Sequence, residues 1–439
     1  MFIVRFFFFF FLLLPVAVGA AEIKEYKLKN GLKVLIIEEH KAPVATFQVW
    51  YRVGSGNEPL GKSGMSHLLE HMMFKGTPRY GPSFLSKIIQ KNGGTDNAHT
   101  TKDYTAYFEI MPSDRITMSV ELEADRMQNL NIDQKEVLSE RDVVMEERRL
   151  RYEDDPQNSL FEEVVAAAYK VHYYRRPVIG WMSDLKSIGR DDLYNYYKTY
   201  YSPDNAVIIV VGDVNAGEIL GKISSSFGEI QDGPARRDIK SEEPVQKGER
   251  RIALKREAEL PFVLMAYHTP NFPDDDSYAL DVLNLILSGG KSSRLYQSLV
   301  YDKKIALNAS ADYSGFNREP YLFFSYATAA PGKDIKGVED SVYAEIEKIK
   351  REPPSEQEVQ KARNQIEASF VMGQDSIYVQ AMKYGMFEML GDWRLVDRYL
   401  AGIRKVTPED VTRVAGKYLT EENRTVGILI PTKEVKSEQ

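Results

Sequence analysis

The sequence predicts an α+β protein built from two tandem copies of one unit. Asp192 and Asp410 lie 218 residues apart, as do Asn205 and Asn423, and each asparagine precedes an apolar strand. The turns at 74–76 and 288–290 give a similar offset of 214 residues. Because these landmarks keep nearly one offset, duplication explains them better than chance similarity between helix–strand blocks. Strands cluster, and helices are expected on one side of them, which favours α+β over a doubly wound sheet.

The elements of the first copy follow from the periodicity of its apolar residues. Apolar runs predict strands over 32–38, 44–53, 104–111 and 206–211, and the strand expected over 425–430 repeats the last of these. Helical spacing predicts helices over 64–74 and 133–152. A polar, charged stretch containing Gly233-Pro234 separates the copies. We therefore expect domains over 22–228 and 251–439, joined by a linker over 229–250.

The first 21 residues have the layout of a secretory signal. Arg5 is followed by an apolar run over 6–18 and then by small residues, so cleavage is expected after Ala20 or Ala21. The alternative is an uncleaved anchor, but this run is short of the roughly 20 residues that span a bilayer. No later run is apolar enough to span one. We expect export across an inner membrane into the periplasm, with no membrane span after signal removal.

Composition excludes several classes of function. The chain has 439 residues, and 57 Lys and Arg against 64 Asp and Glu give a net charge of −7, which argues against nucleic-acid binding. It has no cysteine, which excludes disulfides, thiol nucleophiles and cysteine-ligated zinc. It has only six histidines, so two of them close together are informative.

The informative histidines lie in the stretch His67-Leu-Leu-Glu70-His71. Positions i and i+4 share one face of a helix, so both imidazoles can bind one metal ion, with Glu70 beside them. This spacing is the inverted form of the zincin motif, in which a carboxylate takes a proton from the attacking water. The alternative is a buried helix with two hydrogen-bonded histidines.

A third ligand is available on the helix expected over 133–152. Glu140 and Glu147 are two helical turns apart and so share a face of that helix, which also carries Glu146. A carboxylate-rich helix face is usually just exposed to solvent and has no ligand-binding role. Val143 and Val144 lie between these charges, which indicates a partly buried helix.

With these residues the chain resembles the pitrilysin/insulinase family of zinc metallopeptidases, in the smaller branch that includes mitochondrial processing peptidase and bacterial heterodimeric homologues. The resemblance covers essentially all of 22–439. It rests on His67–Thr77, on Glu140–Glu147, on Gly93-Gly94 with Asn97-Ala98, on Pro177-Val-Ile-Gly-Trp181 and on the duplication.

The resemblance implies a fold and a set of roles. The fold is two tandem homologous α/β-roll domains that form half of a clamshell. One zinc ion per chain would be bound by His67, His71 and Glu147, with Glu70 as general base and Glu140 as a carboxylate that orients a ligand. Peptide would bind as an added strand along the stretch 95–107, where Asn97 and Ala98 are the candidate contacts. His99 is left out of the metal site, and His40, His172 and His268 are interpreted as structural.

The second copy departs from the family pattern. At the aligned place it reads Asn284-Leu-Ile-Leu-Ser288, so it has no metal motif. The family's second half usually supplies an Arg and a Tyr seven residues apart that stabilise the oxyanion, but Val300 and Leu307 stand in that register. Arg294 lies one to two helical turns before that register, so it is interpreted as scaffold. We therefore expect a homodimer, or a heterodimer with a paralogue that supplies the Arg and the Tyr.

The leading hypothesis is a zinc endopeptidase that hydrolyses oligopeptides or unfolded segments, as the metal-bearing subunit of a dimer. The alternative is a non-catalytic structural or assembly subunit, as some members of this family are. Natural substrate and cleavage preference do not follow from the sequence.

Overall fold

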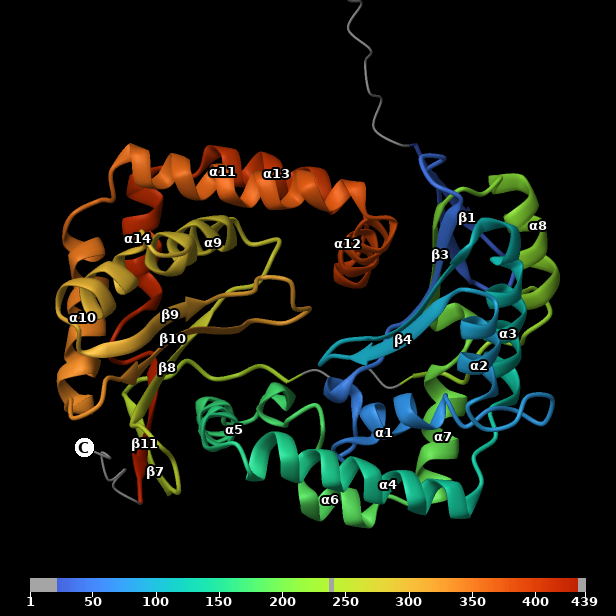
Figure 1. Ribbon diagram of the computed structural model, residues 1–439, viewed down its shortest axis with the longest axis horizontal. Coiled ribbons are helices and arrows are strands. Elements are labelled where there is room, and N and C mark those ends of the chain that lie inside the picture. Colours follow the sequence, from blue (N-terminus) through green and yellow to red (C-terminus); the bar gives the residue numbers. More distant parts are fainter. Residues whose placement is uncertain (1–21, 237–240, 433–439) are drawn as a thin grey trace, which may run out of the picture.

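Each half of the chain builds one mixed β-sheet in the computed structural model, which describes residues 22–236 and 241–432 (Figure 1). The expected signal over 1–21 lies outside the described residues. The first sheet consists of β1 Ile23–Lys27, β2 Lys33–Glu38, β3 Val44–Tyr51, β4 Thr95–Thr100, β5 Thr105–Pro112 and β6 Ala206–Gly212. The second consists of β7 Arg250–Arg256, β8 Phe262–Thr269, β9 Ala306–Asp312, β10 Tyr321–Ala329 and β11 Arg424–Pro431.

The two sheets repeat one topology. The strand order is β1-β2-β6-β3-β5-β4 in the first sheet and β7-β11-β8-β10-β9 in the second. In each, one parallel pair, β2 with β6 or β7 with β11, adjoins antiparallel strands. The predicted duplication and α+β class are therefore confirmed, with β1 as an addition to the first sheet.

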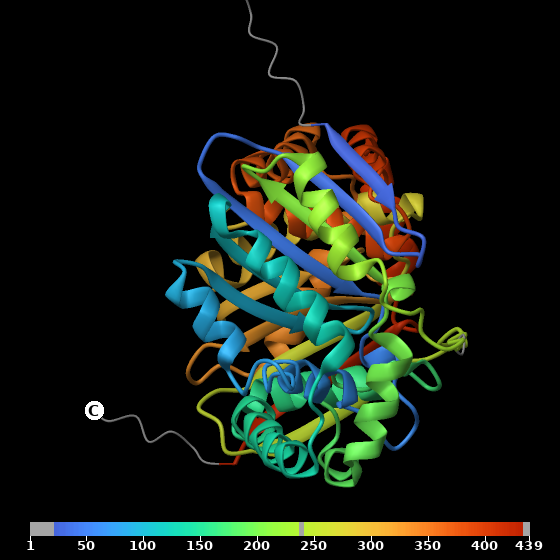
Figure 2. The same ribbon diagram turned by 90° about the vertical axis from the view of Figure 1, so that its right-hand side faces the viewer.

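Helices cover the outer face of each sheet, as Figure 2 shows for the first half. Those of the first half are α1 Met65–Met72, α2 Phe84–Lys91, α3 Thr117–Asn129, α4 Gln134–Arg148, α5 Pro156–Ala168, α6 Met182–Ser187, α7 Arg190–Tyr200 and α8 Ala216–Phe227. Those of the second are α9 Asp275–Ser288, α10 Ile335–Arg351, α11 Glu356–Met372, α12 Ile377–Leu390, α13 Leu395–Lys405 and α14 Pro408–Tyr418. Within 22–236 and 241–432, no helix combines the length and apolar character needed to cross a bilayer.

The expectation that helices lie on one side of the strands was incomplete, because the halves exchange one helix each. α5 of the first half packs on β8 and β11 of the second, and α12 of the second half packs on β3 and β6 of the first. Figure 1 shows α12 between the two sheets. β6 is buried along its whole length, as its continuous apolar sequence requires when both faces are covered.

Glycines allow both exchanged helices to approach closely. A Cβ at Gly385 of α12 would lie 2.2 Å from the indole ring of Trp50 on β3. A Cβ at Gly427 of β11 would lie 2.3 Å from the side chain of Val164 on α5. The two contacts therefore depend on glycine for space, one on the helix and one on the strand.

A buried carboxylate also joins α12 to the first half. Glu388, with a side chain 1% exposed, accepts hydrogen bonds from Lys33 Nζ at 2.9 Å and from Arg52 Nη2 at 2.7 Å. Just beyond α12, Trp393 Nε1 donates to Glu25 Oε2 at 2.8 Å. Since these partners lie about 330 to 370 residues apart in sequence, the two halves fold against each other as one body.

Candidate metal centre

Helix α1 begins without a capping side chain at its own N-cap. That position is Gly64, with φ of 93°. The buried carboxylate of Glu58 instead accepts the backbone N–H groups of Gly64 at 2.9 Å and Ser66 at 2.8 Å, which satisfies two donors at the helix start. Burial raises the pKa of Glu58 to about 7. Sequence reasoning missed Glu58, because the contact depends on the loop between Glu58 and the helix.

The loop over 177–181 holds α1 against α4. A Cβ at Gly64 would lie 2.6 Å from the Ile179 carbonyl oxygen, and one at Gly180 would lie 2.3 Å from the Ser63 carbonyl oxygen. The Gly180 carbonyl in turn accepts a hydrogen bond from Arg148 Nη1, at the end of α4, at 2.9 Å. This close backbone contact explains why the stretch 177–181 has a glycine at position 180. It also fixes the distance between α1 and α4.

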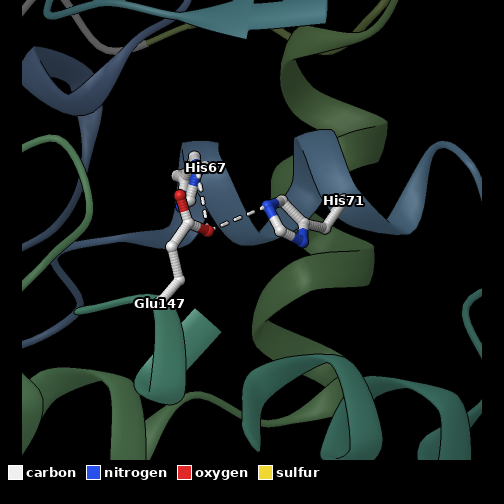
Figure 3. Close-up of side chains that lie close together, drawn as sticks. All are labelled: His67, His71 and Glu147. Carbon is white, nitrogen blue, oxygen red and sulfur yellow. Dashed lines mark ion pairs between the residues drawn. The ribbon is translucent and has the colours of Figure 1, made fainter. Parts of the chain in front are cut away.

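His67 and His71 on α1 face Glu147 on α4 (Figure 3). Glu147 Oε2 lies 3.8 Å from His67 Nε2 and 3.5 Å from His71 Nε2, and the two imidazole centroids are 4.7 Å apart. All three side chains are largely buried. Within the described ranges, these are the one group of His, Asp and Glu side chains whose donor atoms all lie within 4.8 Å of one another.

The donor set fits a zinc ion. Two ligands about 2.1 Å from a tetrahedral zinc are about 3.4 Å apart, close to the separations between Glu147 and the imidazoles. Two imidazole nitrogens and one carboxylate oxygen are also the ligands of catalytic zinc sites with an open position. The residues therefore suit the ion in both spacing and chemistry.

Glu140 lies behind His71. Its Oε1 is 3.0 Å from His71 Nδ1, and its Oε2 pairs with Lys75. Burial lowers the pKa of His71, but hydrogen bonds to Glu140 and Glu147 outweigh it and raise the pKa to about 9. Burial and the neighbouring His71 lower the pKa of His67 to about 4. Glu140 thus fixes the ring of His71 so that Nε2 faces Glu147.

Glu70 is held by a residue that the sequence analysis did not single out. The Thr100 hydroxyl, at the end of β4, donates a hydrogen bond to Glu70 Oε2. Burial raises the pKa of Glu70, and this hydrogen bond opposes the rise. Thr100 lies 30 residues from Glu70 in sequence, so only the fold reveals the contact.

Strand β4 lies at the edge of the first sheet and carries Asn97 and Ala98. Ala98 pairs with Tyr107 of β5 on one side, and no described strand pairs with the other side. His99 packs against Trp50 and Tyr104, at 5.8 and 5.6 Å between ring centroids, and is not part of the donor group.

The residues in the expected oxyanion register of the second half take other positions. Val300 is partly buried against the second-half core, and Leu307 on β9 is 54% exposed. Arg294 donates two hydrogen bonds to Glu358 near the start of α11, at 2.8 and 3.0 Å. That pairing supports the interpretation of Arg294 as scaffold.

A duplicated sheet fold with an inverted zincin motif in one copy is typical of one class of protein, the two-domain chains of a zinc-peptidase family. The family profile described as Insulinase (Peptidase family M16) matches residues 33–180, and that described as Peptidase M16 inactive domain matches 187–366. The chain belongs to peptidase family M16, the insulinase family, as the resemblance implied.

Relatives match nearly the whole chain. Zinc protease PqqE of Helicobacter pylori is 32% identical over 408 residues, covering 92% of each chain. A probable mitochondrial-processing peptidase subunit beta of Arabidopsis thaliana is 28% identical, covering 95% of this chain and 80% of that one. The crystal structure of a protease from Helicobacter pylori has a TM-score of 0.90 at 31% identity, covering 94% of this chain and all of that one.

Proposed function

We propose that this chain is the zinc-bearing subunit of an endopeptidase that hydrolyses oligopeptides or unfolded segments. The observation that carries the proposal is the convergence of His67, His71 and Glu147 between α1 and α4. These three residues would hold one zinc ion per chain. When bound, zinc supplies the Lewis acidity that makes water a usable nucleophile near neutral pH.

Glu70 would act as the general base. Its carboxylate lies on the same helical turn as His71, is largely buried, and is oriented by the Thr100 hydroxyl. It would take a proton from the attacking water and deliver it to the leaving amine. Glu140 would keep the ring of His71 in place through its contact with Nδ1.

The free edge of β4 would bind the substrate. An extended peptide could add beside Asn97 and Ala98 through main-chain hydrogen bonds, which requires an unfolded segment and imposes little sequence preference. Because Thr100 ends β4 and contacts Glu70, this strand would place the peptide next to the general base.

A second chain would complete the site. Val300 and Leu307 cannot donate hydrogen bonds to an oxyanion, and losing such donors costs on the order of 10²–10³ in rate. The single chain should therefore be a weak peptidase, and so should a homodimer, whereas a paralogue carrying the Arg and the Tyr would raise the activity. Residues 1–21 would direct the protein to the periplasm.

The experiment is to compare Glu70→Gln with the wild type for zinc content and for cleavage of an unstructured peptide, alone and mixed with candidate paralogues. Glu70→Gln should keep zinc and lose hydrolysis by more than about 10³-fold, since the base is removed but the ligands remain. Equal hydrolysis by both proteins would refute the role of Glu70. A wild-type chain that binds zinc but cleaves nothing with any paralogue would favour the alternative, a structural subunit.

A further inference from the structure

A cavity of about 630 Å³ lies between α9, α11 and α12 of the second half, and Tyr104 of the first half also lines it. Its walls are mainly apolar and aromatic and include Phe316, Ile366 and Met386. The 214-residue offset between the turns at 76 and 290 corrects the alignment expected from the sequence. Asp281 and Leu285 of α9, not Asn284 and Ser288, stand where the first half has His67 and His71. Both residues line the cavity, so it occupies the second-half equivalent of the cleft between α1 and α4.

The polar groups on the α9 wall are hydrogen-bond acceptors with unused capacity. Asp281 Oδ2 accepts one hydrogen bond, from the Tyr399 hydroxyl at 3.0 Å, and no Lys, Arg or His in the described chain forms an ion pair with Asp281. One turn further on, Asn284 Oδ1 is buried and has no hydrogen-bond partner. Burial raises the pKa of Asp281 to about 7, against the hydrogen bond from Tyr399.

These groups favour a ligand that donates hydrogen bonds and carries positive charge. A buried acceptor without a donor costs free energy that an incoming N–H group would recover. An ammonium would be attracted by a carboxylate and by the faces of Phe316 and Tyr399, which line the same cavity. Its carbon skeleton would fill the apolar remainder.

Lys383 on the α12 wall raises the opposite possibility, a carboxylate ligand. Its ammonium already lies 4.8 Å from the ring centroids of both Phe370 and Tyr384. Lys383 is thus engaged by two aromatic faces, whereas Asn284 Oδ1 has no partner. The unused groups therefore favour an amine.

We propose that this cavity binds a primary ammonium group carried on a small apolar or aromatic skeleton, with the nitrogen at Asp281 and Asn284. The site shares no residue with the donor group of the metal centre, although Tyr104, next to the strand proposed to bind peptide, also lines it. It gives the half that lacks the zinc motif a binding function of its own.

The test is calorimetric titration of the full chain with phenethylamine, with and without a chelator. Phenethylamine should bind one site per chain with a Kd of about 1 mM or tighter in both conditions. N-acetylphenethylamine, which lacks the charge, and 3-phenylpropanoate, which reverses it, should bind at least about 10-fold more weakly. Binding that vanishes with the chelator would place the amine at the metal and overturn the proposal.

Variants locate the nitrogen. Asp281→Asn keeps the shape and the acceptor for Tyr399, and should weaken phenethylamine binding at least about 10-fold. Asp302→Asn, an exposed acid of the same half outside the cavity, should change it less than about 2-fold. Equal affinity in Asp281→Asn and wild type, or tighter binding of 3-phenylpropanoate than of phenethylamine, would overturn the assignment.

Discussion

The two halves of the chain share a strand order and differ in the cleft between two equivalent helices. Between α1 and α4 the first half presents two imidazoles and a carboxylate to one point. Between α9 and α11 the second half presents Asp281, Leu285 and apolar side chains to a cavity. A few residues on one helix face thus distinguish the candidate metal centre from an apolar pocket, while the fold around them is the same.

The largest expected effect tests which histidines belong to the metal centre. His71→Ala removes a ligand, and losing only a residue that orients a ligand costs about 10–100-fold in affinity, so zinc binding should weaken by more than about 100-fold. His99→Ala is the matched control, because His99 lies on the nearby β4 but outside the donor group. Metal analysis after dialysis against a chelator measures both. Equal zinc loss in the two variants would contradict the assignment.

The next effect concerns the acid in the second-half cleft. The folded-state pKa of Asp281, about 7, exceeds that of an unfolded aspartate, so the folded state binds more protons between about pH 4 and 7. The stability associated with this group is therefore fully present below about pH 4 and is lost as pH rises through 7. Asp281→Asn removes this dependence, and its stability relative to wild type should rise by about 2 kcal/mol from pH 5 to pH 8.

Urea unfolding of the chelator-treated protein at both pH values measures this change. Asp302→Asn serves as the exposed control and should follow the wild type at both. If the difference in free energy of unfolding between wild type and Asp281→Asn were the same at both pH values, the raised pKa of Asp281 would be contradicted.

The smallest expected effects concern stability and test the packing of the two exchanged helices, α12 and α5. Gly385→Ala forces α12 away from the rigid indole of Trp50 and should destabilise the protein by about 2 kcal/mol. Gly427→Ala should cost about 1 kcal/mol, because the new Cβ would meet aliphatic groups of Val164 and Leu160 rather than a rigid indole ring. Urea unfolding midpoints measure both.

The control for this pair is Gly416→Ala on α14, where a Cβ would meet nothing within 4 Å. It should stabilise the protein by about 0.5–1 kcal/mol through helix propensity alone. If Gly385→Ala behaved in the same way, α12 would not be packed on Trp50 as described.

Much of the fold could be predicted because its strongest patterns are local. The helix expected over 64–74 is α1, and the strand expected over 206–211 is β6. The helix expected over 133–152 is confirmed as α4, capped by Asp133 and continued by a wider π turn, Arg149–Glu153. In each case periodicity or a capping residue identifies the element without knowledge of its neighbours.

What could not be predicted depends on contacts distant in sequence. The apolar stripe of α5 shows that one face is buried, but not that it packs on the sheet of the other half. For the site, the spacing of His67 and His71 and the resemblance suggested two residues that the fold brings together with Glu147. The roles of Glu58 and Thr100 could not be predicted, because neither residue belongs to a sequence motif. Their contacts depend on the shape of a loop and on the position of a strand.

The exchange of α5 and α12 limits how far either half could fold alone. A single unit on its own would have left one face of its sheet bare and one helix without a surface to cover. Each half therefore depends on the other to cover its sheet, as the subunits of a domain-swapped dimer do, but within one polypeptide.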